Sequence, residues 1–307
     1  MGLRMMNLGI SFPMRWWLGL VILLWGGWVQ ASPAADAHVT DQDTTEAFQD
    51  EGPVRLDKTR EWSMHNARGE RYRIFISEPE GPLPYTGGYP VLYVLDGNAF
   101  FASLHEAKRA QERFQQAIIV GIAYPGEATH NFRRRAYDFS PPPGEPTDPP
   151  QGGQDEFLDF MAQQVMPAVA RQFPVNHDQE TLYGHSFGGM LGLYALYTRP
   201  GLFDHIIAAS PSLWWADRYL LPHERAFSQA VKSGRVDGVN QSLSLMVGDQ
   251  DSLQEQQDAE QLSQRLSGLS AYGLRSSFYR VDGADHMAVP FNIENRILRQ
   301  VLETRNE

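Results

Sequence analysis

One serine in the sequence stands in a setting that suits a nucleophile. Ser186 lies at the centre of "GHSFG" (184–188), which fits the pattern G-x-S-x-G. An apolar stretch precedes this pattern and "MLGLYALYTRP" follows it, so a strand should turn sharply into a helix at the serine. Such a turn lifts the hydroxyl above the edge of a parallel sheet. We therefore expect Ser186 to be the nucleophile of a covalent mechanism.

An acid and a base follow the serine in the order that such a mechanism uses. His286 lies after the last predicted strand, where it would take the proton of Ser186 and return it to a leaving alcohol. Asp251, just past the strand in "SLSLMVGDQD", is the first choice for the acid that orients this histidine. A simple helix N-cap is the alternative role for Asp251. Asp249 is the reserve acid and Asp285 the third choice.

Negative charge that develops on a substrate carbonyl needs backbone N–H donors. We expect one donor at Phe187 and the other in the turn after "VLYVLDG", at Gly97 or Asn98. The nine histidines form no HExxH or H-x-H pair, and no glycine-rich phosphate loop follows a strand. The sequence therefore predicts neither a metal site nor a cofactor.

These residues require a scaffold in which strands and helices alternate. The apolar or alternating segments predicted as strands are "RYRIFISEP" (71–79), "PVLYVLDG" (90–97), "AIIVGIAYP" (117–125), "ETLYGH" (180–185), "DHIIAASPS" (204–212), "SLSLMVGDQD" (242–251) and "RSSFYRVDGADH" (275–286). Helical patterns separate most of them, so we expect one α/β domain with a mostly parallel central sheet flanked by helices on both faces. Residues 125–153 form a long loop rich in Pro and Gly, and the stretch after "SPS" is too short for a large lid.

The start of the chain has the features of an export signal. Arg4 and Arg15 precede the apolar run "WWLGLVILLWGGWV", which ends in small residues, so cleavage is expected after Ala31. An uncleaved anchor is the alternative, but the apolar run is shorter than the roughly 17–25 residues that span a bilayer. We therefore divide the chain into a signal peptide (1–31), a flexible polar tail (32–53) and a folded domain (54–307).

Charge and composition limit the partners. The formal net charge is −11 and becomes two units more negative when the signal is removed with its two arginines. This charge disfavours nucleic acid and stable membrane association, so an anionic substrate would need a local basic patch. The absence of cysteine excludes disulfides and thiolate metal sites, and it is compatible with the periplasm.

Several segments together resemble a known group. "LYVLDGNAFF", "RRRAYDFSP", "LYGHSFGG", "ASPSLWW" and "GADH" are similar to segments of the putative-esterase family of alpha/beta-hydrolases. The resemblance covers about residues 60–300 and is greatest to the trilactone siderophore esterases of the periplasm, of the enterobactin or salmochelin type. It implies an alpha/beta-hydrolase fold and a serine esterase that opens a catecholate siderophore such as ferric enterobactin, for iron release in the periplasm.

The resemblance also implies roles for individual residues. It makes Ser186 the nucleophile and His286 the base, and it places the arginines 133–135 at a catecholate-binding mouth, with Arg135 as the main contact and Arg133 and Arg134 beside it. A bulky ferric trianion would suit these guanidinium groups, although an ordinary solvated charge run is the alternative. Trp214 and Trp215 would either wall an aromatic substrate or pack in the core. Some relatives use a serine–histidine dyad, which leaves the roles of Asp249 and Asp251 open.

Two other functions fit the same residues. One is a general carboxylesterase or thioester hydrolase of the feruloyl or S-formylglutathione type. The other is a siderophore-binding protein that keeps the fold without turnover. The export signal counts against the S-formylglutathione type, and substitution of Ser186 would separate an enzyme from a binder.

Overall fold

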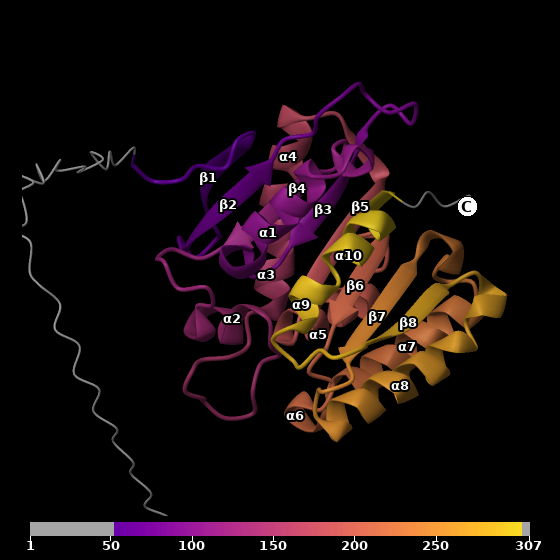
Figure 1. Ribbon diagram of the computed structural model, residues 1–307. Coiled ribbons are helices and arrows are strands. Elements are labelled where there is room, and N and C mark those ends of the chain that lie inside the picture. The colour runs from indigo at the N-terminus through magenta and orange to yellow at the C-terminus, as the bar shows by residue number, and fades with distance from the viewer. Residues whose placement is uncertain (1–51, 303–307) are drawn as a thin grey trace, which may run out of the picture. The chain divides into compact units, whose positions relative to one another are not determined.

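The computed structural model describes residues 52–302, so the predicted signal peptide (1–31) and nearly all of the predicted tail lie outside the described residues. Eight strands form one sheet: β1 (Thr59–His65), β2 (Arg71–Ser77), β3 (Tyr89–Val94), β4 (Ile118–Ala123), β5 (Val175–His185), β6 (His205–Ala209), β7 (Ser242–Gly248) and β8 (Arg275–Val281). Their order across the sheet is β1-β2-β4-β3-β5-β6-β7-β8 (Figure 1). Strands β3 to β8 run parallel, whereas β2 is antiparallel to both of its neighbours.

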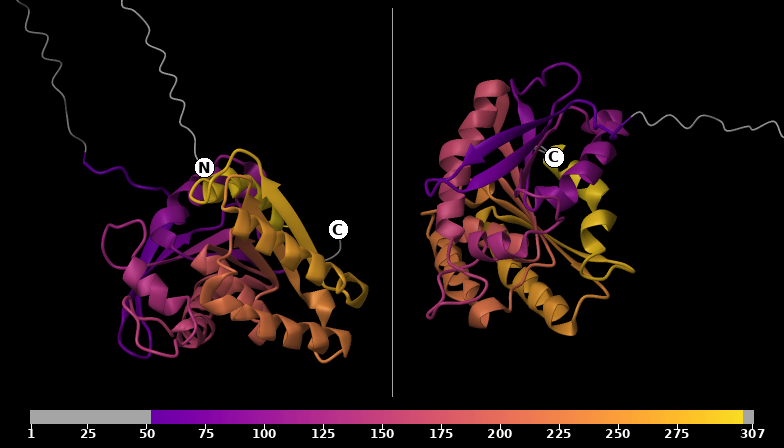
Figure 2. Two further views of the ribbon diagram at one scale, coloured as in Figure 1. Left: turned by 90° about the horizontal axis from the view of Figure 1, so that it is seen from below. Right: turned by 90° about the vertical axis from the view of Figure 1, so that its left-hand side faces the viewer.

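Helices cover both faces of the sheet. They are α1 (Gly97–Arg109), α2 (Phe132–Asp138), α3 (Gln154–Phe160), α4 (Met166–Gln172), α5 (Phe187–Thr198), α6 (Trp215–Arg218), α7 (Leu220–Lys232), α8 (Leu253–Ser267), α9 (Val289–Asn292) and α10 (Glu294–Leu302), with the short turns η1 (Glu112–Phe114), η2 (Met161–Val165), η3 (Gly238–Asn240) and η4 (Ser270–Tyr272). Helices α1, α9 and α10 pack on one face, and α3, α4, α5, α7 and α8 pack on the other. The right-hand view of Figure 2 separates the two layers, with α4 on one side of the sheet and α10 on the other.

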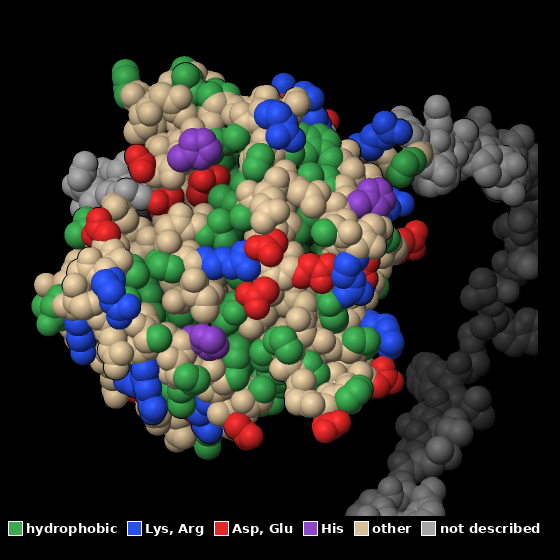
Figure 3. Space-filling model, turned by 180° about the vertical axis from the view of Figure 1, so that it is seen from behind, with side chains coloured by type: hydrophobic (Ala, Val, Ile, Leu, Met, Phe, Trp, Pro, Cys, Tyr) green, Lys and Arg blue, Asp and Glu red, His purple; other side chains and the backbone are tan. Residues whose placement is uncertain are grey.

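Side-chain alternation along the strands fills both layers. In β3, Leu92 and Val94 join the core under α1 and α10, whereas Val91 and Tyr93 join the core on the opposite face. Central strands such as β4 and β7 are buried along their whole length, and the edge strand β1 alternates between half-buried and exposed positions. On the face seen in Figure 3, acidic, basic and apolar side chains are interspersed.

Within the described part of the chain the predicted architecture is confirmed: a mostly parallel sheet with helices on both faces and no large lid. The structure adds elements that the sequence pattern did not predict. Strand β1 precedes the first predicted strand, and α2 lies inside the stretch 125–153 that was expected to be a loop. The helical pattern around Pro167 continues from α3 through η2 into α4, with the proline in the first turn of α4. Across residues 52–302, no helix has the length and apolarity that crossing a membrane requires.

Candidate active site

The parallel strands bring distant segments to a common edge of the sheet. Ser186 and Ser210 directly follow the carboxyl ends of β5 and β6. Asp96, Asp251 and His286 follow the ends of β3, β7 and β8 by a few residues. Ligands of open α/β sheets bind at this edge. The structure therefore gathers here the serine, the acid and the histidine that the sequence predicted.

Ser186 occupies a strained turn between β5 and α5. Its backbone has φ 58° and ψ −117°, a conformation that L-residues with a Cβ rarely adopt. The turn is tight enough that a Cβ on Gly184 would lie 2.3 Å from the carbonyl carbon of Gly188. Only glycine fits at position 184 without movement of the backbone, which explains the first glycine of the G-x-S-x-G pattern.

The segment after β6 holds the serine in place. The Ser186 N–H donates to the Ala209 carbonyl at 2.9 Å, and the Ser212 N–H donates to the Ser186 carbonyl at 3.2 Å. The two hydroxyl oxygens of Ser186 and Ser212 are 3.3 Å apart, within hydrogen-bond distance. The Ser186 hydroxyl is thus oriented by Ser212, which lies in "ASPSLWW" and for which no role was predicted.

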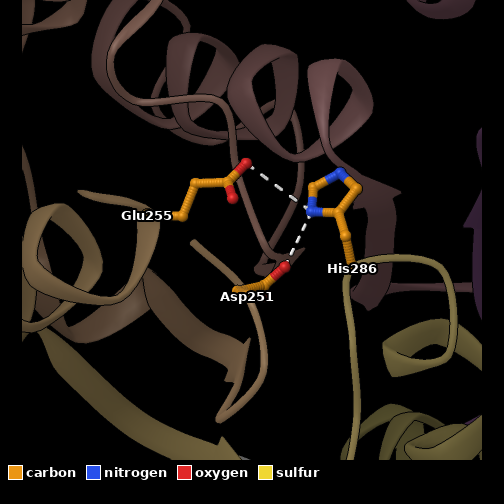
Figure 4. Close-up of side chains that lie close together, drawn as sticks. All are labelled: Asp251, Glu255 and His286. Atoms are coloured by element: carbon orange, nitrogen blue, oxygen red, sulfur yellow. Dashed lines mark hydrogen bonds and ion pairs between the residues drawn. The ribbon is translucent and has the colours of Figure 1, made fainter. Parts of the chain in front are cut away.

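The buried Asp251 and the half-buried His286 form an acid–imidazole pair (Figure 4). His286 Nδ1 lies 2.9 Å from Asp251 Oδ1, while Asp251 Oδ2 accepts hydrogen bonds from the Ser210 hydroxyl at 2.6 Å and the Gly248 N–H at 2.8 Å. Burial alone would raise the pKa of Asp251, but the hydrogen bonds from His286, Ser210 and Gly248 outweigh it and hold the pKa below its ordinary value. The acid is therefore a carboxylate, and Nδ1–H is the donor to it.

The same pair determines the protonation of the His286 ring. The hydrogen bond to Asp251 raises the pKa of the imidazole above its ordinary value, against the opposing effect of burial. With the proton on Nδ1, the other ring nitrogen carries the free lone pair and points away from the carboxylates (Figure 4). This is the tautomer that a general base requires.

The other two candidate acids lie elsewhere. Asp249 is exposed, and its backbone carbonyl accepts a hydrogen bond from the Gln256 side chain. Asp285 is exposed as well, and its carboxylate accepts the backbone N–H groups of Met287 and Ala288. Asp285 thus shapes the loop that carries the histidine, and Asp251 is the one of the three that faces the ring.

His185, the residue before Ser186, connects the loop of His286 to the sheet. Its Nε2–H donates to the His286 carbonyl at 2.8 Å, and the two rings lie 4.6 Å apart between centroids. Burial lowers the pKa of His185 to about 3, so this ring stays neutral at physiological pH. No role was predicted for His185 from the sequence, although its position inside the serine motif could have suggested one.

The residues expected to donate to an oxyanion lie at two helix N-termini. Phe187 is the first residue of α5 and Gly97 the first of α1, and N–H groups at such positions have no partner within the helix. The two turns pack closely, since a Cβ on Gly188 would lie 3.5 Å from Leu95 Cβ. The Asn98 side chain bonds to both the N–H and the carbonyl of Tyr124, so it fixes the start of α1 against the end of β4.

The three arginines differ from the expected row of surface charges. Arg133 is exposed and pairs with Asp148 at 2.9 Å, whereas Arg134 lies over the Tyr72 ring. The Arg135 side chain is only 9% exposed and forms a two-pronged ion pair with Asp96, at 2.9 and 3.0 Å. Because successive helix residues point about 100° apart, three adjacent arginines on α2 face three directions. The three arginines therefore do not form one open mouth as expected. Arg133 is exposed, whereas Arg134 and Arg135 are held by internal partners.

Aromatic side chains lie beside the serine turn on two sides. The Phe187 and Trp215 rings are 4.5 Å apart, and Trp214, which is 38% exposed, packs edge-on against Trp215. On the other side, Phe100 contacts His185 and also the half-exposed ring of Phe291. Trp214 is thus available to a ligand, whereas Trp215 is half-buried against Phe187.

One group of side chains has the donor types of a metal site. Single ligand atoms of Asp251, Glu255 and His286 all lie within 4.8 Å of one another. The histidine atom involved is Nδ1, which donates to Asp251, and the second Asp251 oxygen already accepts two hydrogen bonds. We therefore interpret the group as an acid–base arrangement. A separate open cavity of about 480 Å³ lies among the amino-terminal ends of β6, β7 and β8, at the sheet edge opposite Ser186.

Comparisons with known proteins agree on one group. A family model described as "Putative esterase" matches residues 65–289. The chain is 42% identical over 205 residues to the "Siderophore triacetylfusarinine C esterase" of Aspergillus fumigatus, covering 64% of this chain and 68% of that protein. It is 32% identical over 262 residues to "Ferri-bacillibactin esterase BesA" of Bacillus subtilis, covering 78% and 88%. The crystal structure of the BES protein from Bacillus cereus superposes with a TM-score of 0.76 at 31% identity, covering 83% and 100%.

Proposed function

The chain belongs to the putative esterase family of alpha/beta-hydrolases, and we propose that it hydrolyses the ester bonds of a siderophore. Ser186 is the proposed nucleophile. The chain is a carboxylic ester hydrolase by its family. The assignment of the individual catalytic residues is our proposal, and it rests on the juxtaposition of the strained serine turn with the Asp251–His286 pair at one edge of the sheet.

The proposed reaction runs in two steps. The Ser186 hydroxyl leaves Ser212 and turns to Nε2 of His286, which takes its proton as the oxygen attacks the ester carbonyl. The N–H groups of Phe187 and Gly97 donate hydrogen bonds to the negatively charged oxygen of the tetrahedral intermediate. Its collapse breaks the ester bond, and His286 returns the proton to the departing alcohol. Water then attacks the acyl-serine in the same way, which releases the acid and restores the enzyme.

Asp251 would act on the histidine and not on the substrate. Its carboxylate keeps the proton on Nδ1 and stabilises the imidazolium that forms during each attack. Ser210 and Gly248 hold the second carboxylate oxygen, so the acid cannot rotate away from the ring without losing two hydrogen bonds. This geometry favours a triad over a dyad for this chain.

For the substrate, we propose a catecholate trilactone of the enterobactin or bacillibactin type, presented as its ferric complex. The exposed ring of Trp214 could stack on a catechol, and Arg133 could pair with the complex anion. The named activity of the Bacillus subtilis relative on a ferri-bacillibactin supports this choice, and that of the Aspergillus fumigatus relative on triacetylfusarinine C marks the alternative. We also place the mature domain in the periplasm, on the basis of the N-terminal sequence pattern.

The test uses purified protein from residue 32 onward and its Ser186→Ala variant. Each is incubated with ferric enterobactin, ferric triacetylfusarinine C and a small neutral ester, and the products are identified by mass. We expect the wild-type protein to release catechol-serine units or linear oligomers from the first substrate, and the variant to release none. Fast turnover of the neutral ester alone would instead indicate a general carboxylesterase. Tight binding of the ferric complexes without any hydrolysis would indicate a binding protein.

A further inference from the structure

A second carboxylate faces the catalytic imidazole. Glu255, in the first turn of α8, places Oε1 3.6 Å from His286 Nδ1, on the same side of the ring as Asp251 (Figure 4). Its side chain is only 15% exposed. The proton of Nδ1 is donated to Asp251 at the shorter distance of 2.9 Å. Glu255 therefore acts on the ring as a nearby charge and not as its hydrogen-bond acceptor.

The position of Glu255 is fixed by the start of its own helix. Ser252 is the N-cap of α8, and its hydroxyl and backbone N–H both donate to Glu255 Oε2, at 2.7 and 3.3 Å. The Glu255 N–H donates back to the Ser252 hydroxyl at 3.2 Å, which completes a reciprocal cap. One carboxylate oxygen is thus held by the cap, and the other is directed to His286.

We propose that Glu255 is a positioning residue of the hydrolytic site: its carboxylate, fixed by the cap of α8, stabilises the His286 imidazolium that forms when the base takes the serine proton. The proposal rests on the esterase function argued above. The Coulombic attraction of Glu255 contributes to the raised pKa of His286, after the larger effect of the Asp251 hydrogen bond. Asp251 and Glu255 thus both stabilise the charged form of His286.

The other groups around the ring do not replace this charge. Arg135, on α2, lowers the pKa of His286, but its own charge is largely neutralised by Asp96. His185 is neutral, and the Asp285 carboxylate is engaged by two backbone N–H groups. The titratable and charged groups that face the ring are thus Asp251, Glu255, His185, Arg135 and the adjacent Asp285.

The experiment compares Glu255→Gln with two controls on the same helix. Gln keeps the shape of the side chain and can still accept the two bonds from Ser252, so the cap survives without its charge. Ser252→Ala breaks the cap and leaves the Glu255 charge. Glu260→Gln removes an equal charge from α8 at an exposed site that pairs with Arg280. For each protein, the His286 imidazole is titrated by NMR, kcat/KM is measured against pH on a neutral ester, and Tm is recorded.

We expect Glu255→Gln to move the His286 titration and the acid limb of kcat/KM to lower pH. The plateau of kcat/KM should fall by about three- to tenfold, because a less stabilised imidazolium makes a weaker base. KM and Tm should change little, and Glu260→Gln should match the wild type. Ser252→Ala should lower Tm with a smaller effect on the titration.

An unchanged His286 titration in Glu255→Gln would overturn the proposal, as would loss of activity that simply follows Tm across the three variants. The NMR titration needs no substrate, so this outcome is distinct from failure of the esterase function. A wild-type protein that cleaves no ester would contradict the proposed function, while the titration would still report whether Glu255 holds the imidazolium.

Discussion

The Ser210 hydroxyl donates a 2.6 Å hydrogen bond to the Asp251 oxygen that faces away from His286. Ser210 directly follows β6, and Asp251 follows β7, the next strand in the sheet. Ser210, Asp251 and His286 therefore form a continuous chain of hydrogen bonds across the ends of β6, β7 and β8. The backbone of Ser210 is itself in the left-handed region, with φ 40°, so the turn that presents this hydroxyl is locally strained.

We predict that Ser210→Ala weakens catalysis without weakening substrate binding. Loss of the hydroxyl leaves Asp251 Oδ2 with one donor fewer, which should raise the pKa of the acid and loosen its orientation. A hydrogen bond to a charged group contributes about 1.5–3 kcal/mol, so kcat should fall by roughly 10- to 100-fold while KM stays nearly constant. Steady-state kinetics on a neutral ester tests this. A pure KM effect would show that Ser210 contacts the substrate instead.

Arg133 and Arg135 should behave differently when replaced by alanine. Arg135→Ala leaves the buried Asp96 without its partner, so we expect a loss of about 3–5 kcal/mol in stability and similar loss of activity on neutral and ferric substrates. Adding Asp96→Asn should recover part of that stability. Arg133→Ala should leave stability and neutral-ester hydrolysis unchanged and should raise KM for a ferric catecholate. A selective effect of Arg135 on the ferric substrate would contradict this division.

The pH dependence of hydrolysis should follow His286. Its neutral form is the active base and its pKa is raised, mainly by the Asp251 hydrogen bond, so kcat/KM should fall as the pH drops through a value above the ordinary imidazole pKa of about 6.5. Asp251→Asn should move this limb to lower pH and reduce the plateau by about 10²- to 10⁴-fold. Asp249→Asn is the matched control and should leave both unchanged. An equal loss in the two variants would remove Asp251 from the proposed triad.

Stability above neutral pH should improve when a buried acid behind the site is neutralised. Burial raises the pKa of Asp138 to about 7, from an ordinary value of 3.8, despite the nearby Arg134 and a bond from Tyr72. The folded protein therefore binds more protons than the unfolded chain between these values, and Asp138 makes stability decrease as the pH rises through that range. Asp138→Asn should remove this contribution. The Tm of the variant minus the Tm of the wild type should therefore be larger at pH 8 than at pH 4. Parallel Tm curves for the two proteins would contradict the raised pKa.

Much of the scaffold could be predicted from sequence because apolar strands and helical patterns alternate over most of the stretch from β2 to α10, although helix α7, between β6 and β7, was not predicted. Strand β1 was missed because it lies at the edge, where most of its side chains are exposed and the pattern is weak. Helix α2 was missed because prolines and glycines surround it, although Asn131 caps its first turn. The sequence also predicted that Ser186, Asp251 and His286 would follow strands at the carboxyl edge of the sheet, since parallel strands end at the same edge.

The contacts between side chains could not be predicted in the same way. Glu255 reaches His286 because α8 packs so that its first turn lies next to the β8 loop, and no local pattern encodes that packing. The alternation of polar and apolar residues marks an arginine as exposed unless a partner is known. The partner of Arg135 is Asp96, which is 39 positions earlier in the chain. Helix phase alone could have separated Arg133 from Arg135, and only the fold shows which of them faces inward.

The most direct test of the account is covalent labelling of the proposed nucleophile. Wild-type, Ser186→Ala and His286→Ala proteins are incubated with diisopropyl fluorophosphate, which phosphorylates activated serines, and the intact mass and labelled peptide are determined. We predict one adduct per chain, on Ser186, with no labelling of Ser186→Ala and very slow labelling of His286→Ala. An adduct on another residue would contradict the claim that Ser186 and His286 are catalytic. So would ester hydrolysis by Ser186→Ala at the wild-type rate.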